Sequence, residues 1–218
     1  YFLFFIFFKF IHFSIYLNGE IMKIFGISGS PRLQGTHYAV NYALDYLKEK
    51  GCEVSYFSVA GKEIKFCKHC DYCIRKKEGC IHKDDMNEVY ENLIHADGVI
   101  MGTPIYQGNI TGQLKTIMDR CRAILAKNPK VLSGKVGMGI AVGGDRNGGQ
   151  EIGLRTIHDF YIVNEMIPVG GGSFGANLGA TFWSKDKGKE GIIEDEEGLR
   201  VLRKTLNKFY HIVSKNKI

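Results

Sequence analysis

The sequence lacks several patterns that would each point to a familiar class of protein. Its 218 residues contain no internal repeat, no dinucleotide-binding GxGxxG motif and no GxxxxGK[ST] phosphate loop. The formal net charge of +6 is modest and is spread along the chain, which disfavours a nucleic-acid partner. We also expect no covalent catalysis and no acid–base pair of the kind that a hydrolase needs, so we assign no catalytic residue.

One long apolar run is present, at the N-terminus, where residues 1 to 17 read YFLFFIFFKFIHFSIYL. Lys9 and His12 interrupt this run, no basic region precedes it, and no small-residue cleavage site follows it. These features disfavour a signal peptide or a membrane anchor, although a membrane-associated tail stays open as an alternative. We expect residues 1–21 to be an extension outside the native fold, and residues 22–218 to form one domain.

From Met22 onward, short apolar runs alternate with amphipathic stretches, which is typical of a parallel sheet covered by helices on both faces. We predict an α/β protein with a doubly wound, five-stranded parallel sheet. The expected strands are 23–28, 53–59, 98–102, 135–142 and 166–169, and the expected helices are 36–50, 84–95, 112–126, 148–161 and 195–214. In such sheets a ligand binds beyond the carboxyl ends of the strands, where the strand order reverses.

Four of the six cysteines lie within fourteen residues in the pattern CxxCxxCxxxxxxC: Cys67, Cys70, Cys73 and Cys80. Thiolates are preferred ligands of iron–sulfur clusters and of zinc, and three cysteines at successive three-residue spacings suit a four-iron cluster better than a zinc ribbon. We predict that all four bind one [4Fe-4S] cluster, with structural zinc as the alternative. Because such clusters are rarely placed outside the cytosol, we expect a cytoplasmic protein. Cys52 and Cys121 are expected to be buried and structural.

The loop after the first expected strand is rich in hydroxyl groups and glycine, and it leads directly into a helix. Its sequence is SGSPRLQGT, in which Ser28, Ser30 and Thr36 carry hydroxyls and Arg32 carries a positive charge. Backbone amides, hydroxyls and a helix N-terminus together favour an anion. The loop therefore predicts a phosphate site, although a plain capped turn would have a similar sequence.

Two further loops follow expected strands. The third strand runs into TPIYQGNITG, where Ile105 and Tyr106 could pack on a flat heterocycle or simply cover the sheet edge. The fourth strand ends in GGDRNGGQ, where we expect Gly143 and Gly144 to keep one face open. Three such loops at strand ends indicate a ligand site more strongly than any one of them.

The segments GISGSPR, TPIYQGNITGQLKTIMDR and AVGGDRNGGQ resemble the FMN-binding loops of the NAD(P)H-dependent FMN reductase group of flavodoxin-like proteins. The resemblance becomes more specific with the segment CKHCDYCIRKKEGC, which is inserted in loop 62–83 after the second strand. It resembles the iron–sulfur flavoprotein family of anaerobic archaea and bacteria. The resemblance covers residues 22 to 218.

This resemblance implies FMN and one [4Fe-4S] cluster per chain, exchange of electrons with a carrier such as ferredoxin, and a homotetramer in which a cluster faces a neighbouring flavin. By position, the residues that would bind the FMN phosphate are Ser28, Ser30, Arg32 and Thr36. Those that would border the isoalloxazine or ribityl chain are Pro104, Ile105, Tyr106, Gly108 and Asn109, with Gly143 and Gly144 in the third loop. The family commonly has Gly-Asn-Thr where this chain has Gly35-Thr36-His37, so His37 replaces an expected hydroxyl.

Two other functions stay open. One is an NAD(P)H-dependent FMN or quinone reductase with structural zinc in the four-cysteine loop, and the other is a non-enzymatic assembly module. Lysines, arginines and histidines also surround the cysteines. They form either a docking patch for an acidic redox partner or an ordinary solvated loop.

Overall fold

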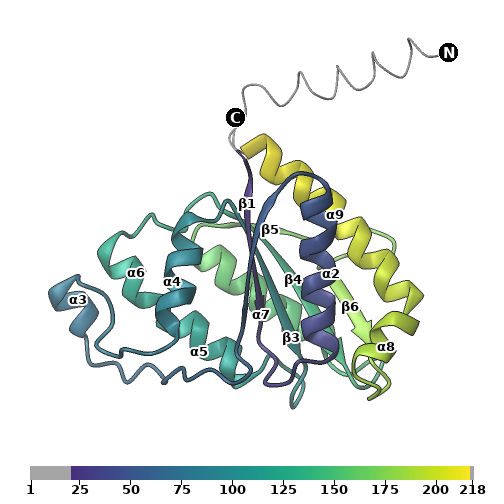
Figure 1. The fold of residues 1–218 in the computed structure, drawn as a ribbon, viewed down its shortest axis with the longest axis horizontal. Coiled ribbons are helices and arrows are strands. Elements are labelled where there is room, and N and C mark those ends of the chain that lie inside the picture. The colour runs from purple at the N-terminus through teal and green to yellow at the C-terminus, as the bar shows by residue number, and fades with distance from the viewer. Residues whose placement is uncertain (1–20, 217–218) are drawn as a thin grey trace, which may run out of the picture.

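The computed structural model describes residues 21–216, and these form three layers with the sheet in the middle (Figure 1). The predicted extension, apart from Ile21, lies outside the described residues. The helices on one face of the sheet are α2 (Gly35–Glu49), α8 (Lys189–Glu194) and α9 (Glu196–Asn216). Those on the other face are α4 (Met86–His95), α5 (Gly112–Arg120), α6 (Arg122–Lys127) and α7 (Gln150–Val163), with the short α3 (Tyr72–Lys76) further out.

The strand order is β2-β1-β3-β4-β5, and every pairing is parallel. The strands are β1 (Lys23–Ser28), β2 (Glu53–Ser58), β3 (Gly98–Pro104), β4 (Val136–Gly143) and β5 (Ile167–Val169). Every residue of β3 and β4 is buried because helices cover both faces of the sheet. The doubly wound parallel sheet is therefore confirmed, and its strand order is the flavodoxin-like one.

The predicted count of five strands was wrong by one. A sixth strand, β6 (Ala180–Trp183), pairs with Ile140–Gly143 of β4, whereas β5 pairs with the earlier part of the same strand, Val136–Met138. Two short strands thus share one edge of β4. The four-residue segment was missed because its pairing depends on β4 rather than on a long local pattern.

The helix predicted over residues 112–126 is also divided, because α5 ends at Arg120 and α6 begins at Arg122. The helices α3 and α8 were not expected. Within residues 21–216, no helix combines the length and the hydropathy that a membrane crossing requires.

Candidate cofactor site at the strand ends

The loop between β1 and α2 is held by its own hydroxyl group. The buried Ser30 Oγ donates to the Arg32 carbonyl (2.9 Å) and accepts from the Arg32 amide (3.2 Å), while the Arg32 side chain is exposed. Thr36 is buried in the first turn of α2, and no acidic residue lies in that turn. The positive end of the helix dipole is therefore not neutralised locally, as an anion site requires.

The first loop is fastened to the loop that follows β3. The Gly29 amide donates to the Gly102 carbonyl (2.8 Å), and Thr111 Oγ1 donates to the Gly29 carbonyl (2.7 Å). The same Thr111 oxygen accepts from the Leu114 amide (3.2 Å) and so caps α5. Thr111 was missing from the predicted site, although a threonine directly before a helix is a usual N-cap signal.

The loop after β3 forms a tight turn at its tip. Tyr106 and Asn109 exchange two backbone hydrogen bonds of 2.9 and 3.1 Å, and the central residues Gln107 and Gly108 have φ values of 49° and 78°. Positive φ at both positions is typical of the type I′ hairpin turn. The turn leaves the Tyr106 ring 41% exposed beside the strand ends, where it is accessible to a ligand.

The loop between β4 and α7 is closed by the side chain of Gln150, which the sequence did not single out as a site residue. Its Nε2 donates to the Asp145 and Phe182 carbonyls (2.6 and 3.2 Å), and its Oε1 accepts from the Gly148 amide (2.8 Å). A Cβ at Gly143 would lie 2.2 Å from Gln150 Nε2. Gly143 therefore makes room for this amide.

The second and third loops touch each other. A Cβ at Gly149, in the third loop, would lie 2.8 Å from the carbonyl oxygen of Gly108, in the second loop. The third loop also lies close to Asp186, because a Cβ at Gly144 would lie 2.7 Å from Asp186 Oδ1. The structure therefore brings together the three loops that were predicted from the sequence. The predicted FMN contacts on these loops stay predictions.

His37 has a different environment from the one that a phosphate ligand would have. Its Nδ1 lies 2.6 Å from the Tyr56 hydroxyl, the two rings are edge to face, and Asn41 Nδ2 donates to the His37 carbonyl. Burial lowers the pKa of His37 and raises the pKa of Tyr56. His37 is therefore held against β2 by a neutral partner.

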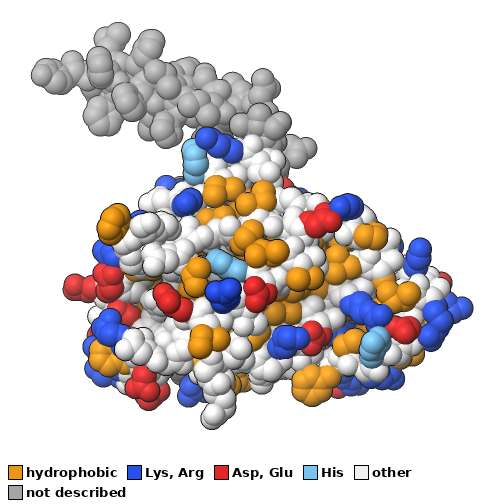
Figure 2. All heavy atoms as spheres, turned by 180° about the vertical axis from the view of Figure 1, so that it is seen from behind, with side chains coloured by type: hydrophobic (Ala, Val, Ile, Leu, Met, Phe, Trp, Pro, Cys, Tyr) orange, Lys and Arg blue, Asp and Glu red, His pale blue; other side chains and the backbone are white. Residues whose placement is uncertain are grey.

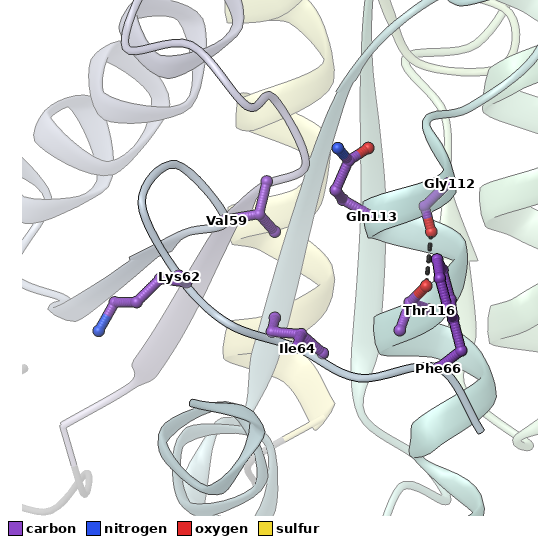
Figure 3. A pocket seen from close by; sticks show the side chains of 7 residues that line it. All are labelled: Val59, Lys62, Ile64, Phe66, Gly112, Gln113 and Thr116. Carbon is purple, nitrogen blue, oxygen red and sulfur yellow. Dashed lines mark hydrogen bonds between the residues drawn. The ribbon is translucent and has the colours of Figure 1, made fainter. Parts of the chain in front are cut away.

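A cavity of about 190 Å³ lies between the start of α5 and the segment that leaves β2 (Figure 3). In Figure 3 the Phe66 ring lies beside Thr116 and Gly112, which share a hydrogen bond of 2.8 Å. Phe66 is 76% exposed and directly precedes Cys67. The cavity therefore lies between the first turns of α5 and the residues that lead into the four-cysteine segment.

The four-cysteine segment lies between β2 and α4, and its thiols are all free. Cys67 is exposed and the other three are partly buried. Residues His69, Asp71 and Lys77 adopt positive φ, so the backbone curls tightly here. Among the residues that the structure describes, no group of three or more histidines, cysteines or carboxylates is arranged to hold a metal ion. The predicted ligands share one loop but are not gathered into a coordination sphere.

The chemistry of this donor set fits an iron–sulfur cluster. Cys73 and Cys80 pack against the core beside α5. The pairing with Asp71 is the main cause of the raised pKa of Arg122, and the nearby Cys73 and Cys67 add to it. The buried guanidinium of Arg120 has an Nε without a hydrogen-bond partner among the described residues. Cys80 interacts electrostatically with this guanidinium. Four free cysteines on one loop are the ligand set that such a cluster takes.

The remaining two cysteines are buried, as predicted. Burial raises the pKa of the Cys52 thiol to about 11 and that of the Cys121 thiol to about 12. Protonated, buried thiols are poor nucleophiles and poor metal ligands. Cys52 and Cys121 are therefore structural.

Positive side chains gather around the four-cysteine segment. Figure 2 shows several Lys and Arg side chains on the side of the molecule that carries α3, with acidic groups interspersed among them. The exposed lysines and arginines of this segment, called here the basic loop surface, are Lys62, Lys65, Lys68, Arg75, Lys76, Lys77 and Lys83.

The strand order and the three joined loops at the carboxyl ends of β1, β3 and β4 define a flavodoxin-like protein. Residues 22–181 match the model of the NADPH-dependent FMN reductase family. An iron-sulfur flavoprotein of Methanocaldococcus jannaschii is 82% identical over 90% of this chain and 99% of its own length. One of Archaeoglobus fulgidus is 55% identical over 88% of this chain and 97% of its own length. The chain belongs to the iron-sulfur flavoprotein family, within the wider NADPH-dependent FMN reductase family.

Solved structures show the same fold at low identity. RosB is 17% identical with a TM-score of 0.68, covering 88% of this chain and 79% of that one. A WrbA-like flavodoxin from Agrobacterium tumefaciens is 16% identical with a TM-score of 0.59, covering 88% of this chain and 99% of that one. The flavodoxin-like architecture is thus confirmed.

Proposed function

We propose that this chain is a redox protein that binds FMN at the three strand-end loops and a [4Fe-4S] cluster at the four-cysteine loop. It would transfer electrons between a one-electron carrier such as ferredoxin and an acceptor. The observation that carries the proposal is the position of α5, which joins the two regions. Thr111 at its start is bonded to the first loop, and Arg120 at its end is bonded to the cysteine segment.

At the strand ends, the chain supplies groups suited to a phosphate and to a flat ring. The residues proposed to hold the phosphate are Ser28, Ser30, Arg32 and Thr36. Those proposed to border the ring and ribityl chain are Pro104, Ile105, Tyr106, Gly108, Asn109, Gly143 and Gly144. The α2 N-terminus and the exposed Arg32 provide positive potential, and the turn at Gln107 and Gly108 leaves Tyr106 partly exposed beside the strand ends.

At the cysteine loop, Cys67, Cys70, Cys73 and Cys80 would be the cluster ligands. Bound FMN exchanges one or two electrons and a cluster exchanges one, so together they connect two-electron and one-electron chemistry. The basic loop surface gives a docking region for an acidic carrier. We also propose that the chain forms the homotetramer that the family resemblance implies.

Metal and flavin analysis of protein purified without oxygen tests this function. We expect about four irons and one FMN per chain, with a reducible cluster signal in EPR spectra. One zinc per chain with FMN would instead support a conventional flavin or quinone reductase. Protein that contains no flavin would contradict the site at the strand ends.

A cysteine variant tests the ligand assignment separately from the flavin site. Cys73→Ala should lose the iron and the visible absorbance of the cluster while it retains FMN, because the flavin loops lie on other elements. Cys52→Ala is the matched control, since Cys52 is buried away from the loop, and it should retain both. Full iron content in Cys73→Ala would count against the assignment.

A further inference from the structure

Arg120, the last residue of α5, carries a charge that is fully buried. Its Nη1 lies 2.9 Å from Asp84 Oδ2 and its Nη2 lies 3.0 Å from Asp84 Oδ1, and both side chains are 1% exposed. This is a two-point pairing between a guanidinium fork and a carboxylate. A buried pair of this kind is retained only where its geometry is well satisfied, so Arg120 is held in one position.

The pair fixes both ends of the four-cysteine segment to α5. Arg120 Nη1 also donates to the Lys65 carbonyl (2.5 Å), and Asp84 Oδ2 accepts from the Lys65 amide (3.0 Å). Lys65 lies two residues before Cys67, and Asp84 lies four residues after Cys80. Both ends of the four-cysteine segment are therefore held together at the Arg120–Asp84 pair.

One nitrogen of this guanidinium makes no hydrogen bond to the described residues. Arg120 Nε is buried and has no hydrogen-bond partner among the described residues. The nearby Tyr90 hydroxyl already donates to the Arg120 carbonyl (2.9 Å). Cys80 packs against the core cluster that contains Tyr90. Of the four cysteines, it is the one that interacts electrostatically with both Arg120 and Tyr90. A buried, unpaired Nε requires an acceptor, and the described residues supply none.

We propose that Arg120 is a positioning residue for the iron–sulfur centre, with its Nε donating a hydrogen bond to the sulfur of Cys80 while its two Nη groups hold the ends of the cysteine loop. This inference rests on the function proposed above. A hydrogen bond to a ligand sulfur stabilises the more negative, reduced cluster and so raises its reduction potential. Arg120 would thus set both the geometry and the potential of the centre.

Arg122 is the natural comparison. It also lies near ligand cysteines, but its side chain is 37% exposed and it pairs with Asp71 at 2.7 Å. Solvent and salt screen an exposed charge far more than a buried one. The two arginines therefore separate the effect of a buried, directed donor from that of a nearby positive charge.

The first experiment is an EPR-monitored redox titration of the wild type, Arg120→Lys and Arg122→Lys, all purified without oxygen. Lysine at position 120 keeps a cation for Asp84 but removes the Nε donor. We expect a more negative cluster potential and roughly tenfold faster iron loss to a chelator for Arg120→Lys, with Arg122→Lys close to wild type. An Arg120→Lys cluster with full iron and the wild-type potential would overturn the inference.

A second measurement needs no loss of the buried pair and decides the matter if Arg120→Lys fails to fold. Wild-type protein labelled with ¹⁵N-arginine should show hyperfine coupling of a nitrogen to the reduced cluster in pulsed EPR. The coupling should persist in labelled Arg122→Lys, and its absence from the wild type would overturn the inference. Wild-type protein without iron and sulfide would instead contradict the proposed function itself.

Discussion

Thr111 Oγ1 donates a hydrogen bond of 2.7 Å to the carbonyl oxygen of Gly29, a residue 82 positions away in the sequence. The same hydroxyl oxygen accepts from the Leu114 amide and caps α5. One side chain therefore connects the β1–α2 loop to α5, the helix whose last residue, Arg120, is bonded to the cysteine segment.

Thr111→Val should weaken both features at once, because valine keeps the shape and removes the hydroxyl. We expect a loss of about 1 to 2 kcal/mol in the free energy of unfolding, from the lost cap and the unpaired Gly29 carbonyl. FMN should also dissociate more readily. Urea unfolding and fluorescence titration with FMN measure the two effects.

Thr205→Val is the matched control, since the buried Thr205 hydroxyl bonds only within α9, to the Val201 carbonyl (2.9 Å). Its FMN affinity should equal that of the wild type. Equal FMN affinity in Thr111→Val and Thr205→Val would show that the bond to Gly29 does not shape the ligand site.

Gly29→Ala should abolish FMN binding. A Cβ at Gly29 would lie 2.7 Å from Leu114 Cβ and 3.2 Å from the Gly102 carbonyl oxygen, so the loop would have to move away from β3 and α5. Gly112→Ala is the control, because a Cβ there meets nothing within 4 Å. FMN content after purification separates the two, and normal FMN content in Gly29→Ala would contradict this packing.

Alkylation should divide the six cysteines of the cluster-free chain into two groups. Burial raises the pKa of Cys52 to about 11 and that of Cys121 to about 12, so few thiolates exist there near pH 8. Cys67, Cys70, Cys73 and Cys80 are exposed or partly buried and should react first. Peptide mapping by mass spectrometry after brief iodoacetamide treatment measures the order, and early labelling of Cys121 would be inconsistent with the packed core.

The stability of the FMN-free protein should fall as the pH is lowered through the range below about 6.5. Burial lowers the pKa of His37 and of His158 below the ordinary value of 6.5, so the unfolded chain binds more protons than the folded one in that range. The free energy of unfolding then rises with pH until these histidines are neutral in the unfolded chain.

His37→Gln should reduce this pH dependence, and His158 would account for part of the remainder. The control is His95→Gln, which changes a largely exposed histidine on α4. Urea unfolding at pH 5.5 and 7.5 gives the slopes. A slope for His37→Gln as steep as that of the wild type would show that His37 does not titrate differently on folding.

Much of the fold could be predicted because its signals are local. The strands starting at Lys23 and Glu53 begin where the apolar runs begin, and β3 and β4 read as continuous apolar segments. The helices end within a few residues of their predicted positions, except that the 112–126 helix divides at Cys121. The strand β6 was missed because its pairing with β4 has no counterpart in its own four residues.

The loops that carry hydroxyls, glycines and thiols could be identified before the fold was known, since turn chemistry and ligand type depend on residue identity and short spacing. How these groups are joined depends on long-range packing. The pairs Thr111–Gly29 and Arg120–Asp84 link residues 82 and 36 positions apart, and Gln150 closes its loop by bonding to Phe182, 32 positions away. Such polar pairs form where packing brings two buried groups together, and no local pattern encodes that meeting.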